Sequence, residues 1–375
     1  MNKLKVMTIF GTRPEAIKMS PLIKELEKNE QIDSIVTVTA QHREMLDQVL
    51  NLFNIKPDYD LNIMKKAQSL TDITTNVLIG LKNIIANENP DIVLVHGDTT
   101  TTFVGSLSSF YQKVKIGHIE AGLRTNNKYS PYPEEMNRKI TGVLADLHFA
   151  PTNIAKSNLL NENILEKDIF ITGNTVIDAL LSTVDKEFKF NISELNNIDF
   201  KNKKIILLTA HRRENLGKSM KNIFRAIKVI VENNNVEVIF PVHLNPKIRV
   251  LANEILGDIE SIHLIEPLEY ESFANLIAKS YLIITDSGGI QEEAPGLGKP
   301  VLVLRNTTER PEALEAGTVK LVGTNMEKII SSANKLIRYD EEYQKMANAV
   351  NPYGDGNASK KIVDVLINKF NSRNI

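Results

Sequence analysis

Short apolar runs, rich in β-branched residues, alternate along the chain with longer segments whose apolar residues recur at helical spacing. The first such pair predicts a strand at residues 6–10 and a helix at 16–29. Further strands in the first half are predicted at 35–39, 92–95, 116–119 and 147–150. This alternation is typical of a parallel sheet whose faces are covered by helices.

A second set of strands and helices begins after Thr172-Gly173-Asn174-Thr175, with predicted strands at 205–209, 236–240, 262–265, 282–285 and 301–304. Residues 185–204 are polar and rich in asparagine, and we interpret them as a surface connection. The last segment, 358–370, again has helical spacing. The pattern predicts an α/β protein with two Rossmann-like, doubly wound domains, residues 1–172 and 173–357, facing each other across a cleft.

The composition is that of an ordinary soluble protein, with 42% hydrophobic and 24% charged residues over 375 positions. A net charge of -1 with both signs interspersed offers no basic field to nucleic acid or an anionic membrane. The absence of cysteine excludes disulfides, thiolate catalysis and cysteine-based zinc sites. The chain starts in a strand pattern instead of a signal peptide, and no apolar run approaches the roughly 20 residues of a membrane span. We expect a cytoplasmic protein.

Polar residues follow the predicted strands, at the edge of the sheet where open α/β proteins bind ligands. After the first strand, Gly11 permits a tight turn, Thr12 can cap a helix and Pro14 suits its first position. The helix start then offers N–H groups to an anion, and Arg13 and Lys18 add positive charge. Arg13 could equally be a solvated loop residue, but its place at a strand end favours function.

Three carboxylates, Asp98, Glu120 and Glu134, come from segments that follow predicted strands, so they share one rim of one sheet. Asp98 alone would be interpreted as a helix cap. Together the three suit proton transfer, which needs acid and base groups with different pKa values. Glu134 and Glu135 also fit as first-turn acids that complement a helix dipole, and we expect that role for one of them.

In the second half, His211, Arg212 and Arg213 follow a strand and could bind a diphosphate. The alternative is a charge run on a solvated face. His243 follows another strand, and a structural role is an equal alternative there.

A strand, a Ser287-Gly288-Gly289 turn and a helix start come later in the chain. The two glycines permit close approach of the backbone, so N–H groups and the Ser287 hydroxyl could bind phosphate. Glu293 lies one turn into the helix and could accept ribose hydroxyls. Phe273 could stack on a base, although an amphipathic helix would bury it by default.

Metal and nucleophile motifs are weak or missing. Asp58-Tyr59-Asp60 matches a D-x-D pattern, but it lies in a connection after Pro57. No histidine spacing typical of zinc enzymes and no G-x-S-x-G nucleophile motif occurs. We therefore predict no metal site and no cofactor.

Taken together, these segments resemble the non-hydrolysing UDP-N-acetylglucosamine 2-epimerases of bacteria. Five or more motifs occur in order, from Gly11-Thr12-Arg13-Pro14-Glu15 to Gly354-Asp355-Gly356-Asn357-Ala358. The resemblance implies a GT-B architecture whose C-terminal helix returns to the first domain, so that 358–375 completes residues 1–172. It also implies UDP-N-acetylglucosamine and UDP as ligands, a homodimer, and a product used in surface polysaccharide synthesis.

The family chemistry eliminates UDP across C1–C2, which gives a 2-acetamidoglucal, and then adds UDP back after protonation from the other face. By motif, the resemblance implies Asp98, Glu120 and Glu134 as the acid–base set, with His211 acting near the diphosphate. It implies substrate contacts from Arg13, Lys18, Arg212, Phe273, Ser287, Gly288, Gly289 and Glu293. Which carboxylate takes the C2 proton stays open.

Bacterial relatives also bind a second UDP-N-acetylglucosamine as an activator, and its contacts would fall on Gln41, His42, Glu135, Arg212 and His243. The chain departs from the family pattern at Glu44, Ala67 and Asn306. The alternatives are a GT-B glycosyltransferase, a hydrolysing epimerase that releases UDP, and a non-catalytic UDP-sugar sensor. A reaction of the UDP-sugar without any acceptor separates the epimerases from the other two.

Overall fold

Parallel strands form two separate sheets in the computed structural model of the chain, which describes residues 3–41, 43–65 and 67–371. The chain divides into a first unit, Met1–Ser182 with Tyr353–Ile375, and a second unit, Thr183–Pro352. Within the described residues, no helix is long and apolar enough to cross a membrane.

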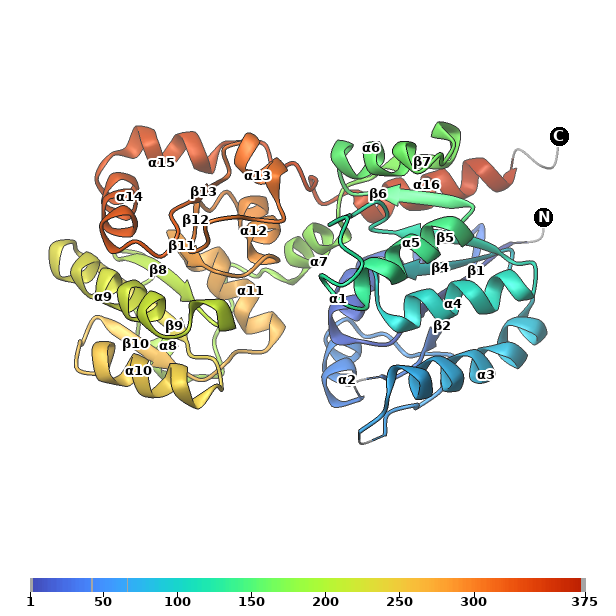
Figure 1. The fold of residues 1–375 in the computed structure, drawn as a ribbon, viewed down its shortest axis with the longest axis horizontal. Helices are drawn as coiled ribbons and strands as arrows, with labels where there is room; N and C mark the ends of the chain where they lie inside the picture. Colours follow the sequence, from blue (N-terminus) through green and yellow to red (C-terminus); the bar gives the residue numbers. More distant parts are fainter. Residues whose placement is uncertain (1–2, 42, 66, 372–375) are drawn as a thin grey trace. The chain divides into compact units, whose positions relative to one another are not determined.

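The sheet of the first unit has the order β3-β2-β1-β4-β5-β6-β7, and all of its strand pairs are parallel. The strands are β1 (Leu4–Phe10), β2 (Ile32–Val38), β3 (Tyr59–Asp60), β4 (Ile92–His96), β5 (Lys115–Ile119), β6 (Leu147–Ala150) and β7 (Ile169–Ile171). The helices are α1 (Arg13–Lys28), α2 (Arg43–Leu52), α3 (Leu70–Glu88), α4 (Thr100–Tyr111), α5 (Glu134–Leu144), α6 (Asn153–Asn161), α7 (Thr175–Thr183) and α16 (Ala358–Asn371), as Figure 1 shows.

Strand β1 is buried on both faces, because successive side chains of a strand point to opposite sides. Val6 and Phe10 pack into a core formed with α1, α2 and α16. Met7 and Ile9 pack into the opposite core, formed with α3 and α4. This explains why the strand reads as a continuous apolar run in the sequence.

The sheet of the second unit has the order β10-β9-β8-β11-β12-β13 and is also parallel throughout. Its strands are β8 (Lys204–Thr209), β9 (Val236–Pro241), β10 (Ile262–Ile265), β11 (Leu282–Thr285), β12 (Val301–Val303) and β13 (Val319–Leu321). The longer helices are α9 (Lys218–Asn233), α10 (Pro246–Leu256), α11 (Tyr270–Lys279), α14 (Met326–Arg338) and α15 (Asp340–Ala347), and the short ones are α8 (Ser193–Asn196), α12 (Ile290–Glu293) and α13 (Pro311–Glu315).

The prediction of two doubly wound parallel sheets is confirmed. The interpretation of residues 185–204 as a surface connection is wrong in part. Leu195 of α8 is fully buried, and the ring of Phe190 lies 5.3 Å from that of Phe188 and 5.7 Å from that of Phe200, measured between centroids. Three aromatic residues spread through a polar stretch give no periodic signal, so the sequence hides this small core.

The C-terminal helix α16 packs on α1 in the first unit, where Ile362, Val363 and Leu366 are buried. Its first turn is capped by Asp178 of α7, which accepts hydrogen bonds from the N–H groups of Ala358 (3.2 Å) and Ser359 (2.7 Å). The family expectation of a C-terminal helix that returns to the first domain is therefore confirmed.

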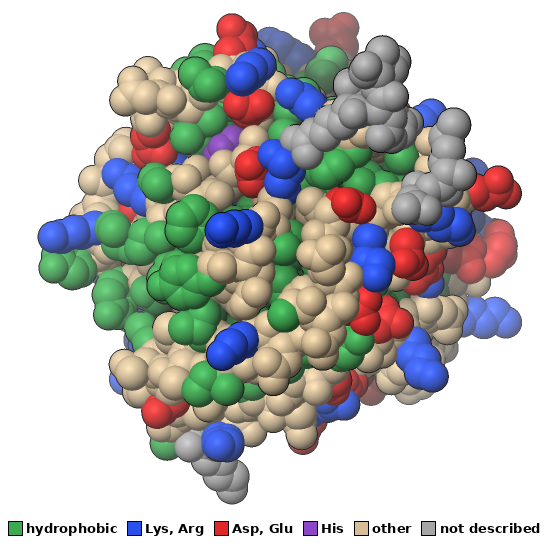
Figure 2. Space-filling view, turned by 90° about the vertical axis from the view of Figure 1, so that its right-hand side faces the viewer, with side chains coloured by type: hydrophobic (Ala, Val, Ile, Leu, Met, Phe, Trp, Pro, Cys, Tyr) green, Lys and Arg blue, Asp and Glu red, His purple; other side chains and the backbone are tan. Residues whose placement is uncertain are grey.

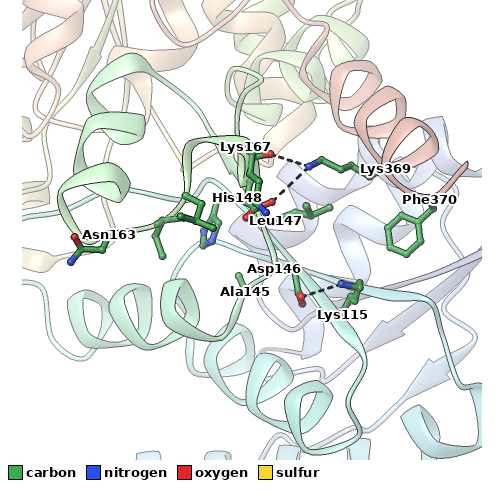
Figure 3. Close-up of a pocket in the computed structure, with 12 residues that line it drawn as sticks. Lys115, Ala145, Asp146, Leu147, His148, Asn163, Lys167, Lys369 and Phe370 are labelled. Atoms are coloured by element: carbon green, nitrogen blue, oxygen red, sulfur yellow. Dashed lines mark hydrogen bonds and ion pairs between the residues drawn. The ribbon is translucent and has the colours of Figure 1, made fainter. Parts of the chain in front are cut away.

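The other end of α16 borders a cavity of about 470 Å³ at the amino-terminal edge of β5 and β6, drawn in Figure 3. Lys369 donates a hydrogen bond to the carbonyl of Lys167 (3.0 Å) and lies 3.7 Å from the carboxylate of Asp168. Lys115 and Asp146 form a second ion pair there, at 3.4 Å. The Lys369 contacts, together with the Asp178 cap, tie both ends of α16 to the first unit.

We expect Leu366→Ala to lower the free energy of unfolding of the first unit by about 2–5 kcal/mol, because it leaves a cavity under α16. Leu366 is completely buried. Urea titration would measure the loss. Leu165, which is 60% exposed, is the matched control, and its change to alanine should stay within about 0.5 kcal/mol. Equal losses in the two variants would contradict the assigned packing of α16.

Candidate functional site

The order of strands reverses once in each sheet, between β1 and β4 in the first unit and between β8 and β11 in the second. In open α/β sheets, ligands bind beyond the carboxyl ends of the strands at such a reversal. In the first unit this edge carries the loops after β1, β4 and β5. In the second unit it carries His211, after β8, and Asp286, after β11.

Glu15 joins the starts of α1 and α4 from a buried position, with 3% of its surface exposed. Its carboxylate accepts hydrogen bonds from the N–H groups of Gly11 (3.1 Å) and Thr12 (2.9 Å), and from the hydroxyls of Thr99 (2.8 Å) and Thr102 (3.1 Å). Burial raises the pKa of Glu15, against the opposing effect of these donors. Thr12 and Glu15 form a capping box, which fixes the loop that carries Arg13.

The carboxylate of Glu120 is held in place by two side chains of the first unit. Lys18 forms an ion pair with its Oε1 atom, and the side-chain amide of Asn174 donates to the same oxygen at 2.8 Å. Glu120 is only 9% exposed and has a φ of +61°, a conformation that L-residues adopt only where their surroundings hold them. Lys18 and Glu120 were both predicted at the site, and the structure brings them into direct contact.

Asp98 is held by Arg138, whose Nε and Nη2 atoms both donate to Oδ2 of the carboxylate, at 2.9 and 2.7 Å. The side-chain amide of Asn137 donates to the backbone carbonyl of Asp98 at 2.9 Å. Arg138 also contacts Glu135 at 3.1 Å. The guanidinium group fixes the position of the Asp98 carboxylate.

Glu134 and Glu135 open α5 and differ in their surroundings. Glu135 is fully buried and accepts hydrogen bonds from the N–H groups of Thr125 and Asn126. Burial alone would raise the pKa of Glu135, but these donors and Arg138 lower it. Glu134 Oε2 is a buried atom without a hydrogen-bond partner among the described residues. Glu135 therefore organises the loop, and Glu134 offers an oxygen for chemistry.

Asp286 is the centre of the edge in the second unit and is completely buried. Its carboxylate accepts hydrogen bonds from the N–H groups of His211 (3.0 Å) and Arg212 (3.0 Å), and from the side-chain amide of Asn215 (3.1 Å). The Nδ1 atom of the His211 ring lies 3.0 Å from Oδ1. Burial would raise the pKa of Asp286, but His211 and the Arg212 N–H group lower it.

Two guanidinium groups flank the predicted glycine turn. A Cβ atom added at Gly288 would lie 3.9 Å from Nη2 of Arg310 and 4.0 Å from Nη2 of Arg212. The N–H group of Ser287 already donates to the Thr285 hydroxyl at 2.9 Å, so it is not available to a phosphate. The edge can bind an anion chiefly through the two arginines.

Glu293 and Phe273 lie on α12 and α11 of the second unit. Glu293 Oε1 would lie 3.9 Å from a Cβ atom at Gly289, so these two predicted residues are neighbours. Tyr270 has a buried hydroxyl without a partner in the described part of the chain, and burial together with the charge of Glu293 raises the pKa of that hydroxyl. Phe273 is half-buried.

His211, Arg212 and His243 line a pocket of about 520 Å³, and the rings of the two histidines stack with centroids 6.0 Å apart. Two of the residues predicted for an activator, Arg212 and His243, therefore share one pocket. Gln41 belongs to the first unit, where the Thr101 hydroxyl donates to it at 3.4 Å. His42, another predicted contact, lies outside the described residues.

Asp58 and Asp60 serve the fold of the first unit. Asp58 accepts a hydrogen bond from the Val36 N–H group at 2.8 Å, and Asp60 forms an ion pair with Arg43. Within residues 3–41, 43–65 and 67–371, no group of histidine and carboxylate side chains is arranged to hold a metal ion.

Five residues of these two edges were not singled out by sequence reasoning: Glu15, Arg138, Asn174, Asp286 and Arg310. Glu15 had a signal, because Thr12-Arg13-Pro14-Glu15 fits the capping-box pattern. Asp286 had one too, since it directly follows a buried strand. Arg138, Asn174 and Arg310 lie in helices and loops where the sequence alone offered no signal.

Two doubly wound sheets, one with a carboxylate-rich edge and one with an arginine-rich edge, define an α/β protein of the GT-B type. Residues 24–367 match a family described as UDP-N-acetylglucosamine 2-epimerase. The UDP-N-acetylglucosamine 2-epimerase of Bacillus subtilis is 60% identical over 374 residues, which are 100% of this chain and 97% of that protein.

Solved structures agree. The UDP-GlcNAc 2-epimerase of Neisseria meningitidis bound to UDP-GlcNAc matches with a TM-score of 0.84 and 57% identity, over 97% of this chain and 100% of that chain. MnaA of S. aureus in complex with UDP matches with a TM-score of 0.83 and 54% identity, over 98% of this chain and 97% of that chain. The chain belongs to the UDP-N-acetylglucosamine 2-epimerase family.

Proposed function

We propose that this protein interconverts UDP-N-acetylglucosamine and UDP-N-acetylmannosamine by elimination and re-addition of UDP. The hydrogen on C2 of the sugar is not next to a carbonyl, so its direct removal would be very slow. Loss of UDP from C1 together with the C2 proton gives a 2-acetamidoglucal instead. Protonation of C2 from the other face and return of UDP complete the inversion.

The first unit supplies the acid and base groups at C2. Arg138 donates two hydrogen bonds to one oxygen of Asp98, so this carboxylate is held in place. We assign the proton exchange with C2 to Glu120 and Glu134, one from each face of the ring. Asp98 acts as a fixed hydrogen-bond acceptor beside them.

The second unit binds the nucleotide and stabilises the leaving group. Arg212 and Arg310, on either side of Gly288, neutralise charge that develops on the diphosphate as the C1–O bond breaks. His211, oriented by Asp286, acts beside them. Glu293 accepts hydrogen bonds from the ribose hydroxyls, and Phe273 stacks on uracil.

One observation carries the proposal: three carboxylates with three different surroundings lie at one edge of one sheet. Lys18 and Asn174 hold Glu120, Arg138 holds Asp98, and Glu134 has an unpartnered buried oxygen. A glycosyltransferase needs a general base for an acceptor, whereas inversion of C2 needs an acid and a base on the donor sugar itself. The set fits the second requirement.

The test is to incubate the purified protein with UDP-N-acetylglucosamine alone and follow the phosphorus and proton spectra. We expect UDP-N-acetylmannosamine to appear, with no free UDP building up. Accumulation of UDP and free N-acetylmannosamine would establish a hydrolysing enzyme instead. An unchanged substrate, even at high concentration, would contradict epimerisation and favour a glycosyltransferase or a sensor.

We further propose that two copies of the chain associate through the outer faces of α3, α4 and α5. These helices pack side by side. They expose Ile79 (67% exposed), Phe110 (55%), Tyr111 (62%) and Val143 (80%). Hydrophobic side chains also gather on the left of the face shown in Figure 2, with few charged groups between them. Exposed apolar residues concentrated on adjacent helices are typical of a protein interface.

We expect the double change Ile79→Asp and Phe110→Asp to convert the dimer to a monomer, because each buries a carboxylate in an apolar interface. Sedimentation velocity would give the mass. Val350→Asp in the second unit is the matched control, since Val350 is 83% exposed and should leave the mass unchanged. A dimer that survives the double change would rule out this face.

A further inference from the structure

We propose that His96 is a positioning residue that accepts a hydrogen bond from the acid form of Glu120 and so fixes which carboxyl oxygen carries the C2 proton. This inference rests on the proposed function, in which Glu120 exchanges a proton with the sugar. No sequence motif assigned a role to His96, which ends β4 immediately before the turn that carries Asp98.

The geometry places His96 directly beside the carboxylate. The imidazole is 2% exposed, and its Nε2 atom lies 4.0 Å from Oε2 of Glu120. Nε2 is buried and has no hydrogen-bond partner among the described residues. A buried polar atom without a partner costs free energy, so its position at a reactive carboxylate needs an explanation.

The two oxygens of Glu120 are not equivalent. Oε1 accepts from the Lys18 ammonium group and from the Asn174 amide, and a proton on that oxygen would compete with both donors. Oε2 faces His96 and packs against Gly97, where an added Cβ atom would lie 3.3 Å away. Protonation therefore falls on Oε2, the oxygen next to the imidazole.

His96 is neutral and offers a lone pair. Burial lowers its pKa to about 4; the nearby Lys18 charge also lowers this pKa, and the Glu120 charge raises it. Besides Lys18 on α1 and Glu120 after β5, the ring faces His118 of β5, which is itself neutral because burial lowers its pKa to about 3. In the tautomer that carries its ring proton on Nδ1, the buried Nε2 atom is a hydrogen-bond acceptor.

The transfer of the C2 proton to Glu120 conserves atoms and charge. When Glu120 acts as base, the C2 proton moves to Oε2, the C2–H electron pair forms the C1=C2 bond, and the C1–O pair leaves with UDP. The new O–H group donates to Nε2 of His96, which gains no charge. A small rotation of the carboxyl group closes the 4.0 Å separation to hydrogen-bond distance. In the reverse direction Glu120 delivers a proton from Oε2 to C2.

The test compares His96→Leu, which removes the acceptor, with His96→Gln, whose side-chain carbonyl can replace it. Losing a hydrogen bond to the acid form weakens Glu120 as a base. For His96→Leu we expect kcat to fall about tenfold or more, and the acid-side fall of kcat/KM to move down by about one pH unit. His96→Gln should recover much of kcat and bring the acid-side fall of kcat/KM back towards its wild-type pH. His148→Leu is the matched control, because His148 is also buried and neutral but belongs to β6.

A structural role alone would not move the pH profile. If His96→Leu keeps the wild-type acid side, or if His96→Gln behaves like the leucine variant while both remain folded, the inference is wrong. The inference is also wrong if His148→Leu shifts the acid side of the pH profile by the same amount. Wild-type turnover is measured first in the same assay, so a failure of the proposed function is seen separately, as absence of product from the unmodified protein.

Discussion

Glu120→Gln is expected to lower kcat by about 10²–10⁴-fold, which is the usual contribution of a general acid or base. Glutamine keeps the shape of the side chain and can still accept hydrogen bonds from Lys18 and Asn174 at one oxygen. It cannot take a proton from C2. Because the contacts in the site largely persist, KM should change much less than kcat.

The control for Glu120 is Glu88→Gln, since Glu88 is also paired with a lysine in the first unit, Lys5, at 3.3 Å. Lys5 is in the first part of β1 and Glu88 ends α3, away from the carboxylate edge. The Glu88 variant should keep wild-type kcat. Turnover within a few-fold of wild type in Glu120→Gln would remove Glu120 from the acid–base set.

Asp286→Asn is expected to lower the free energy of unfolding of the second unit by about 1–3 kcal/mol at neutral pH, because it leaves at least one buried hydrogen-bond donor without an acceptor. The asparagine has one acceptor oxygen where the carboxylate accepts from His211, Arg212 and Asn215. Urea titration measures the loss. Asp199→Asn, at an exposed turn of the same unit, should change the free energy by no more than about 0.5 kcal/mol.

The effect of Asp286 depends on pH in a defined direction. Its pKa is lowered in the folded protein, so the ionised group contributes its full stabilisation above the ordinary carboxyl pKa of about 3.9. That stabilisation is lost as the pH falls through the lower folded pKa. The gap between wild type and Asp286→Asn should therefore stay constant from pH 7 to about 5 and shrink only below about pH 4. A gap that closes by pH 6 would contradict the assignment.

The sequence predicted the sheets well because parallel strands buried on both faces read as continuous apolar runs, as in β1. Strands β3, β7 and β13, which have two or three residues each, were not predicted. Helix α1 starts at Arg13, where the prediction began at residue 16, since the capping residues Thr12 and Glu15 were not interpreted together.

The site was predictable where a residue directly follows a buried strand, as Asp98, Glu120 and His211 do. The contacts that hold these site residues in place were not predictable. Asn174 reaches Glu120 across 54 positions of the chain, and His211 and Asp286 are 75 positions apart. Such pairs come together only through the order of strands in the sheet, which periodicity does not specify.

The most direct test of the central claim is whether the hydrogen on C2 exchanges with solvent during the reaction. The protein is incubated with UDP-N-acetylglucosamine in deuterated buffer, and the deuterium content at C2 of the product is measured by proton spectroscopy. Our account predicts UDP-N-acetylmannosamine that carries deuterium at C2, because Glu120 and Glu134 exchange their protons with solvent between the two half-reactions. Product that keeps its original hydrogen at C2, or no product at all, would contradict it.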